Sequence, residues 1–162
     1  MSPMHICFVC SGNICRSPMA GIVFREHLKR AGLDGRVTVT SRGTGGWHVG
    51  DGADYRAAKV LAQHGYPTSH TAAMLSRDDL EADLLVALDA GHERALKRLV
   101  ERVGGDPSRI RLLRSFDPSA RANLDVPDPY YGASGGFTEV MRMIEASMPG
   151  LLDWVRANLD GD

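Results

Sequence analysis

The strongest constraint on this sequence is an apolar run that is followed, within eight residues, by a helix start. Residues 5–9 are short and mostly apolar, as expected of a strand that is buried on both faces of a parallel sheet. Ser17 is a good helix N-cap, and Pro18 suits the first helical position after it. Residues 10–16 are therefore predicted to be a tight connection between a buried strand and a helix.

The same alternation continues along the chain. Strands are predicted at residues 5–9, 37–41, 84–88 and 110–113. Amphipathic helices lie between them and end at Gly32, Gly65 and Gly104. A last helix carries apolar residues from Phe137 to Leu159, with a bend expected at Pro149. Residues 43–52 and 116–136 are rich in Gly, Pro and polar residues and are predicted to be loops.

Strands that alternate with helices predict an open parallel α/β sheet with helices on both faces. A chain of 162 residues fits one domain with one core, so residues 1–162 are expected to form a single domain. Ligands of such sheets bind at the carboxyl ends of the strands. This rule points to the loop after residue 9 before any motif is considered.

Composition narrows the possible partners and the cellular location. The formal net charge is −1, which argues against a broad nucleic-acid or membrane surface, and no window is apolar enough to span a bilayer. All three cysteines, Cys7, Cys10 and Cys15, lie near the N-terminus, which is not the pattern of a secreted disulfide framework. The first residues lack a basic segment typical of a signal peptide. We expect a cytoplasmic monomer, with signal-independent export left open.

The loop itself has the chemistry of an anion site. Free amides and the positive end of a helix dipole meet where a strand leads into a helix. Gly12 and Asn13 tolerate a positive φ, which would let the backbone curl its amides inward. Arg16 adds a planar fork that matches two phosphate oxygens at once. These groups would favour the thiolate of Cys10, which then becomes a nucleophile for phosphorus at the base of the loop.

Other interpretations of the loop fit less well. A lone cysteine in such a loop is more often inert and buried, but here the five-residue gap to Arg16 and the Ser-Pro helix start occur together. A metal cluster lacks a fourth ligand because no cysteine follows Cys15, so neither a metal nor a cofactor is expected. The Gly-Lys-Ser/Thr ending of a Walker A loop is missing, and the later stretch 43–48 has His48 where a dinucleotide fingerprint needs glycine.

Two segments resemble those of a known family. The loop Val9-Cys10-Ser11-Gly12-Asn13-Ile14-Cys15-Arg16-Ser17-Pro18 resembles the phosphate-binding loop of low-molecular-weight protein tyrosine phosphatases, and Asp128-Pro129-Tyr130-Tyr131 resembles the general-acid loop of that family. Further similarities occur around Ser41, Trp47, His64-Gly65 and Ser69-His70, and in the run Leu85-Val86-Ala87-Leu88-Asp89. The middle segments are most similar to those of actinobacterial members. The resemblance covers nearly the whole chain.

The resemblance implies a three-layer, flavodoxin-like fold with a four-stranded parallel sheet, and metal-free hydrolysis of phosphotyrosine in proteins. It assigns Cys10 as the nucleophile and Arg16 as the phosphate ligand, within the phosphate-binding residues 11–15. The hydrogen-bond network that holds the loop would comprise Asn13, Ser17, Ser41 and His70. The mouth of the substrate pocket would be lined by Trp47, Tyr130 and Tyr131.

The general acid is expected to be Asp128. Pro129 restricts the backbone of Asp128 to an extended conformation and would fix its direction. Asp125, three residues earlier, is the main rival, and Asp128 is favoured because it belongs to the Asp-Pro-Tyr-Tyr match. Tyr130 and Tyr131 are also expected to be exposed, which makes a kinase acting on either of them a further candidate partner.

Cys15 is a candidate redox partner of Cys10. A reactive thiolate with a neighbouring thiol can form a disulfide under peroxide and so escape irreversible oxidation. The resemblance supports such protection. Cys7 belongs to the predicted buried strand and is expected to be structural.

Three rival functions remain to be compared. An arsenate reductase on the same fold needs downstream cysteines, and none follows Cys15. Protein arginine phosphatases resemble this loop but carry Thr at the position of Ile14, and the apolar Ile14 favours a phenyl phosphate. A catalytically inactive phosphopeptide-binding module would be expected to lose Cys10 or Asp128, and both are present.

Overall fold

The computed structural model describes residues 3–130, 132 and 135–159. Its centre is one four-stranded sheet in the order β2-β1-β3-β4, with every neighbouring pair parallel. The strands are β1 (Met4–Cys10), β2 (Val37–Gly43), β3 (Leu84–Ala87) and β4 (Ile110–Leu112). The predicted four-stranded parallel sheet is therefore confirmed.

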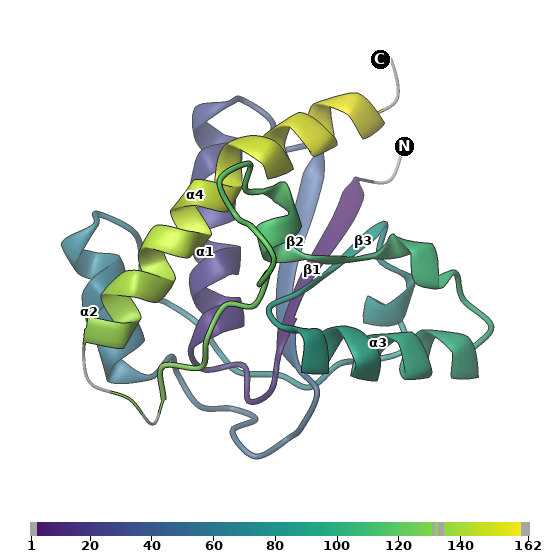
Figure 1. Cartoon of the computed structure of the whole chain (residues 1–162), viewed down its shortest axis with the longest axis horizontal. Helices are drawn as coiled ribbons and strands as arrows, with labels where there is room; N and C mark the ends of the chain where they lie inside the picture. Colours follow the sequence, from purple (N-terminus) through teal and green to yellow (C-terminus); the bar gives the residue numbers. More distant parts are fainter. Residues whose placement is uncertain (1–2, 131, 133–134, 160–162) are drawn as a thin grey trace.

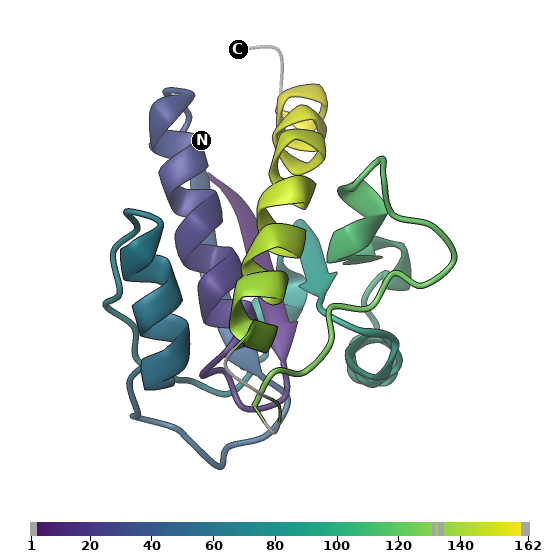
Figure 2. The ribbon, with the colours of Figure 1, turned by 60° about the vertical axis from the view of Figure 1, so that its left-hand side comes forward.

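Four helices cover the two faces of this sheet. They are α1 (Arg16–Arg30), α2 (Tyr55–Gln63), α3 (Ala90–Arg102) and α4 (Gly135–Asn158). Helices α1, α2 and α4 lie side by side on one face, and α3 lies alone on the other (Figures 1 and 2). This arrangement confirms the predicted three-layer architecture. No helix in the described part of the chain has both the length and the apolarity needed to cross a bilayer.

Strand β1 divides the hydrophobic core between the two faces. Ile6, Phe8 and Cys10 point into the larger core with α1, α2 and α4, whereas Cys7 and Val9 point into the smaller core under α3. Successive side chains of a strand alternate between faces, and both neighbours of β1 pair with it in parallel register. Cys10 and Cys7 therefore belong to different layers, and Cys10 ends the strand at its carboxyl edge.

The helices end at the glycines that the sequence analysis identified, whereas the ends of the strands differ slightly from the predicted ones. Gly32, Gly65 and Gly104 have φ values of 72°, 80° and 76°, so each ends its helix in the left-handed conformation that glycine adopts without strain. Strand β4 ends at Leu112 because Leu113 begins a short 3-10 helix, η3 (Leu113–Phe116), which the pattern did not predict. Helix α4 continues through Pro149.

The loops that follow the strands gather at one edge of the sheet. In Figure 1 this edge lies at the bottom, below the arrowheads, and the turn between β1 and α1 lies beside the loop after β2. Backbone hydrogen bonds join these two loops, from Thr44 N to Cys10 O (2.9 Å) and from Gly45 N to Ser11 O (3.1 Å). The fold thus places the predicted anion loop within a frame of other loops.

Candidate active site

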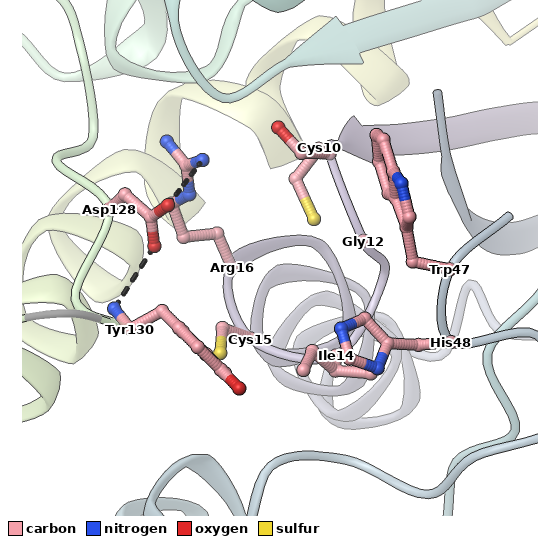
Figure 3. A pocket seen from close by; sticks show the side chains of 10 residues that line it. Cys10, Gly12, Ile14, Cys15, Arg16, Trp47, His48, Asp128 and Tyr130 are labelled. Atoms are coloured by element: carbon pink, nitrogen blue, oxygen red, sulfur yellow. Dashed lines mark hydrogen bonds and ion pairs between the residues drawn. The ribbon is translucent and has the colours of Figure 1, made fainter. Parts of the chain in front are cut away.

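A cavity of about 480 Å³ opens at the carboxyl edge of the sheet. It is lined by Cys10, Ser11, Gly12, Ile14, Cys15, Arg16, Trp47, His48, Asp128 and Tyr130. Cys10 and Arg16 are buried, the half-exposed Asp128 lies beside Arg16, and Trp47 and Tyr130 stand on opposite sides of the cavity (Figure 3). The structure thus brings together residues that are separated by more than a hundred positions in the sequence.

The loop after β1 turns at Asn13. This residue has φ = 59°, the only positive φ of a non-glycine residue in the described ranges. Gly12 was expected to share that conformation, but its φ is not positive. A Cβ on Gly12 would lie 3.0 Å from Cδ2 of His48, a tight contact that the His48 side chain would have to relieve by moving. The expectation about Asn13 is confirmed, and the expectation about Gly12 is corrected.

Asn13 is also the centre of a buried hydrogen-bond network. Its Nδ2 donates to the hydroxyls of Ser17 (2.8 Å) and Ser41 (3.1 Å), and its Oδ1 accepts from the backbone of Ala73 (2.9 Å). The Nε2 of His70 lies 2.7 Å from the backbone oxygen of Asn13. Burial lowers the pKa of His70, so the imidazole is neutral at neutral pH and Nε2 carries the proton that Asn13 accepts. All four side chains of the predicted loop-support set are within this network.

Ser17 is not the helix cap that the sequence suggested. Helix α1 begins one residue earlier, at Arg16, with Cys15 at the cap position and no side-chain cap. The Ser17 hydroxyl instead lies 2.8 Å from Sγ of Cys10 and accepts from Asn13. Because Ser17 is already the second residue of the helix, it does not occupy the cap position, and its hydroxyl is used by the loop instead.

Arg16 is almost fully buried and is held from two sides. Its Nη1 donates to Oδ2 of Asp89 (2.8 Å) and to the backbone oxygen of Val126 (2.9 Å). Burial alone would raise the pKa of Asp89, but hydrogen bonds from the backbone of His92 and from Arg16 hold it below its usual value. Asp89 is therefore ionised and keeps the guanidinium oriented toward the cavity. The sequence analysis placed Asp89 in a segment similar to the family but assigned it no role.

His92 is a second residue that the sequence analysis missed. It lies in the first turn of α3, is 5% exposed, and its Nε2 is 2.9 Å from the hydroxyl of Ser11. Its Nδ1 lies 3.2 Å from Oδ1 of Asp89. The distance is short, but the two groups are not aligned for a hydrogen bond, and Nδ1 has no hydrogen-bond partner among the described residues. The contact between Nδ1 and Asp89 is therefore electrostatic. Burial lowers the pKa of His92 to about 4.

The two candidate acids occupy different environments. Asp128 lines the cavity, its side chain is 44% exposed, and its Oδ2 lies 3.8 Å from Nη2 of Arg16. Its Oδ1 accepts a hydrogen bond from the backbone of Tyr130 (3.0 Å), which fixes the carboxylate within its own turn. Asp125 instead accepts from the backbone of Ala90 (2.9 Å) at the start of α3. Asp125 is thus engaged at a helix terminus and is not among the residues that line the cavity.

The rim of the cavity is exposed and aromatic. Trp47 is 74% exposed and packs against Gly45, where a Cβ would collide with the indole ring. Tyr130 is 36% exposed on the other side. The guanidinium of Arg56 lies 5.3 Å from the Tyr130 ring centre and is fixed by Asp54 through two bonds of 3.1 Å. Tyr131, also predicted for the rim, lies outside the described residues.

The three cysteines are all free and buried. Burial raises the pKa of Cys7 to about 12 and that of Cys15 to about 12, so both are protonated at neutral pH. Cys15 shares the cavity wall with Cys10, whereas Cys7 lies on the opposite face of the sheet. Among the described residues, no group of three or more His, Cys, Asp or Glu side chains is arranged to hold a metal ion.

Comparisons with known proteins agree with this geometry. Residues 5–160 match the family model described as low molecular weight phosphotyrosine protein phosphatase. The chain is 54% identical, over 158 residues, to the low molecular weight protein-tyrosine phosphatase A of Mycobacterium tuberculosis, an alignment that covers 97% of this chain and 94% of that protein.

Two solved structures share the fold along almost the whole chain. The structure of YfkJ from Bacillus subtilis superposes with a TM-score of 0.88 at 33% identity and covers 97% of each chain. The drosophila arginine phosphatase DARP superposes with a TM-score of 0.87 at 29% identity, covering 97% of this chain and 99% of that one. Because DARP is described as an arginine phosphatase, the shared fold alone does not identify the phosphorylated substrate. The family assignment rests on the sequence similarity, which extends over residues 5–160. On that similarity, and with the cysteine–arginine loop at the edge of its parallel sheet, this chain belongs to the low-molecular-weight phosphotyrosine protein phosphatase family.

Proposed function

We propose that this protein hydrolyses phosphotyrosine in proteins through a phosphocysteine formed on Cys10. The observation that carries the proposal is the grouping of Cys10, Arg16 and Asp128 around one cavity whose rim is aromatic. A sulfur nucleophile, a guanidinium and a carboxyl group at the opening are the three groups that a metal-free phosphoryl transfer needs.

Substrate binding follows from the shape and charge of the cavity. The phosphoryl group would be held by the loop after β1, where the first amides of α1 have no intrahelical acceptor, and by the fork of Arg16. The phenyl ring would lie against Ile14 and between Trp47 and Tyr130, which line the cavity nearer to solvent. A planar ring between aromatic side chains buries apolar area and selects for aryl phosphates.

In the first step the Cys10 thiolate attacks phosphorus. The S–P bond forms as the P–O bond to the phenol breaks, and protonated Asp128 donates its proton to the departing phenolate oxygen. The Ser17 hydroxyl, 2.8 Å from the sulfur, donates a hydrogen bond that stabilises the thiolate before attack and after release. Arg16, held by Asp89, stabilises the charge that spreads over the phosphoryl oxygens in the transition state.

In the second step water attacks the phosphocysteine. Asp128, now ionised, accepts a proton from that water as the new P–O bond forms and the S–P bond breaks. Inorganic phosphate leaves and the Cys10 thiolate is regenerated. The 44% exposure of the Asp128 side chain leaves room for this water beside the carboxylate. The same carboxyl group thus acts as an acid in one step and as a base in the next.

Phosphoarginine is the second substrate to consider, because an arginine phosphatase shares the fold. We favour phosphotyrosine because Ile14 presents an apolar side chain to the cavity, beside the aromatic rim. A guanidino group placed there would lose hydrogen bonds to water that these apolar groups cannot replace. Matched peptides that carry phosphotyrosine or phosphoarginine in one sequence would decide between the two substrates by their kcat/KM.

Cys15 is proposed to protect Cys10 from irreversible oxidation. Peroxide would oxidise the Cys10 thiolate to a sulfenic acid, and the Cys15 sulfur would then displace water to form a disulfide that an added thiol reduces. A Cys15→Ala variant should recover less activity after peroxide and dithiothreitol than the wild type does. Equal recovery of the two proteins would contradict the protective role.

The primary test is the turnover of p-nitrophenyl phosphate in the presence of a metal chelator. We expect turnover that orthovanadate inhibits competitively, and release of phosphate from tyrosine phosphopeptides. Asp128→Ala should retain phosphopeptides and so identify physiological substrates in a lysate. Tight binding of phosphopeptides by the wild type without any turnover would instead indicate a binding module.

A further inference from the structure

Two separate sets of contacts support the loop after β1, and only one of them lies around Asn13. The second set begins at Ser11, the residue that follows Cys10, whose hydroxyl lies 2.9 Å from Nε2 of His92. His92 comes from the first turn of α3, on the opposite face of the sheet from α1. The loop is therefore attached to both layers of helices.

The His92 ring also faces the carboxylate that holds Arg16. Its Nδ1 lies 3.2 Å from Oδ1 of Asp89, and Oδ2 of the same carboxylate accepts from Arg16 at 2.8 Å. The backbone amide of His92 donates to Oδ1 as well (3.0 Å). Ser11, His92, Asp89 and Arg16 thus form a continuous chain of contacts that starts beside the nucleophile and ends at the phosphate ligand.

The burial of His92 indicates that this chain of contacts is maintained at a cost in stability. The side chain is 6% exposed, and its Nδ1 has no hydrogen-bond partner within the described part of the chain. A buried polar atom without a partner is destabilising, whereas an apolar side chain of similar size would avoid that penalty. Because burial keeps the imidazole neutral, only one of its two nitrogens carries a proton, and Nε2 alone is hydrogen-bonded among the described residues.

We propose that His92 is a positioning residue of the phosphatase site, which fixes Ser11 of the phosphate loop relative to the Asp89–Arg16 pair. It does not touch the substrate and transfers no proton. It sets the distance between the loop and the guanidinium, so that both contact the same phosphoryl group. The inference rests on the proposed function and adds a residue to it.

The test compares two substitutions of His92 and one of Ser11 with a control substitution in the same helix. His92→Leu removes both ring contacts, His92→Gln keeps a polar group near the Nε2 position, and Ser11→Ala removes the hydroxyl on the loop side. Leu96→Ala is the matched control, since Leu96 is buried in the same helix and belongs to the core rather than to this set of contacts. The double variant Ser11→Ala/His92→Leu completes a double-mutant cycle.

The readouts are binding of inorganic phosphate by calorimetry, kcat and KM for p-nitrophenyl phosphate, and urea unfolding. We expect His92→Leu to weaken phosphate binding by about tenfold and to lower kcat/KM by about ten- to a hundredfold, because a small misplacement of the ligating groups is costly. His92→Gln should recover most of both losses. Leu96→Ala should unfold at lower urea and bind phosphate like the wild type.

The double variant should lose no more than the larger of its two single variants, because both act through one contact. The proposal would be overturned if the fold-losses of the two single variants multiplied in the double variant. It would also be overturned if His92→Leu bound phosphate like the wild type, or if its losses were no different from those of Leu96→Ala. A wild type that binds phosphate but never hydrolyses p-nitrophenyl phosphate would refute the proposed function alone. The calorimetric comparison would still decide the role of His92.

Discussion

The floor and the rim of the cavity are built in different ways. In the buried loop that forms the floor, Asn13, Arg16 and Ser17 are at most 4% exposed. The side chains of Asn13 and Arg16 each make two hydrogen bonds to groups distant in the sequence, and that of Ser17 makes one, to the backbone oxygen of Arg42. On the rim, Trp47 is 74% exposed, and Tyr130 is placed by its own turn and by the Arg56 cation. A buried and fully bonded floor holds the reacting groups in place, whereas an exposed rim can be altered at little cost.

The largest expected effect is that of Cys10→Ser on the floor. A serine hydroxyl at neutral pH is a far weaker nucleophile than a thiolate, so turnover of p-nitrophenyl phosphate should fall by at least about 10⁴-fold. The small change in size should leave the urea midpoint close to that of the wild type. Turnover close to the wild-type rate in Cys10→Ser would show that catalysis does not need the sulfur and would contradict the mechanism.

Asp128→Asn should come next, because it changes a group that lies between floor and rim. Loss of a general acid should lower kcat by about 10²- to 10³-fold. The loss should be smaller for p-nitrophenyl phosphate than for phenyl phosphate, because p-nitrophenolate leaves more easily without a proton. Asp125→Asn is the matched control, and it should affect stability by about 1 kcal/mol through its contact with α3 while leaving this leaving-group dependence unchanged.

Asn13→Ala tests the rigidity of the floor itself. The substitution removes three hydrogen bonds and places alanine at φ = 59°, so we expect a loss of about 3 kcal/mol in the free energy of unfolding. Urea unfolding measures this loss directly. Asn13→Gly keeps the backbone free of strain, and the difference between the two variants separates conformation from hydrogen bonding. Wild-type stability in both variants would mean that the network contributes little.

The pH dependence of stability should report on the buried floor as well. His92 has a pKa of about 4 in the folded protein and about 6.5 when unfolded, so the unfolded chain binds more protons between these values. Its contribution is complete above pH 6.5 and is lost as the pH falls toward 4, by about 3 kcal/mol. His70, whose pKa is also lowered by burial, adds a loss in the same direction. In His92→Gln the slope of stability against pH should be smaller over this range.

The smallest effects are expected on the rim. Trp47→Ala should raise KM for a tyrosine phosphopeptide by about threefold to tenfold, with little change in stability, because the side chain is mostly in solvent. Tyr55→Ala is the control, since Tyr55 is 77% exposed but is not among the residues that line the cavity. Equal effects of the two substitutions on KM would mean that Trp47 contributes no more to substrate binding than an exposed aromatic residue outside the cavity.

The sequence predicts this site best where the residues are close together along the chain. The strand–loop–helix unit, Cys10 and Arg16 lie within one short segment, so periodicity and spacing are sufficient to identify them. Asp89 and His92 are 73 and 81 residues from their partners Arg16 and Ser11. No local pattern connects such distant residues, and only the pairing of β1 with β3 brings them into contact.

Local preferences also failed where tertiary contacts compete with them. Ser17 has the sequence context of a helix cap, but its hydroxyl is engaged by Cys10 and Asn13. Gly12 looked like a residue chosen for its backbone freedom, but its φ is not positive, and the atom closest to an added Cβ would belong to the side chain of His48. In both cases the relevant neighbour comes from the fold and not from the adjacent sequence.

The parallel register of β1 has a consequence for how this chain tolerates changes in length. Because β1 pairs on both sides and its side chains alternate between two cores, inserting or deleting one residue in it would exchange the faces of Phe8 and Val9. The same change would carry the nucleophile off the end of the strand. Indels should therefore be excluded from residues 4–16 and accepted more readily in the exposed loop at 105–106.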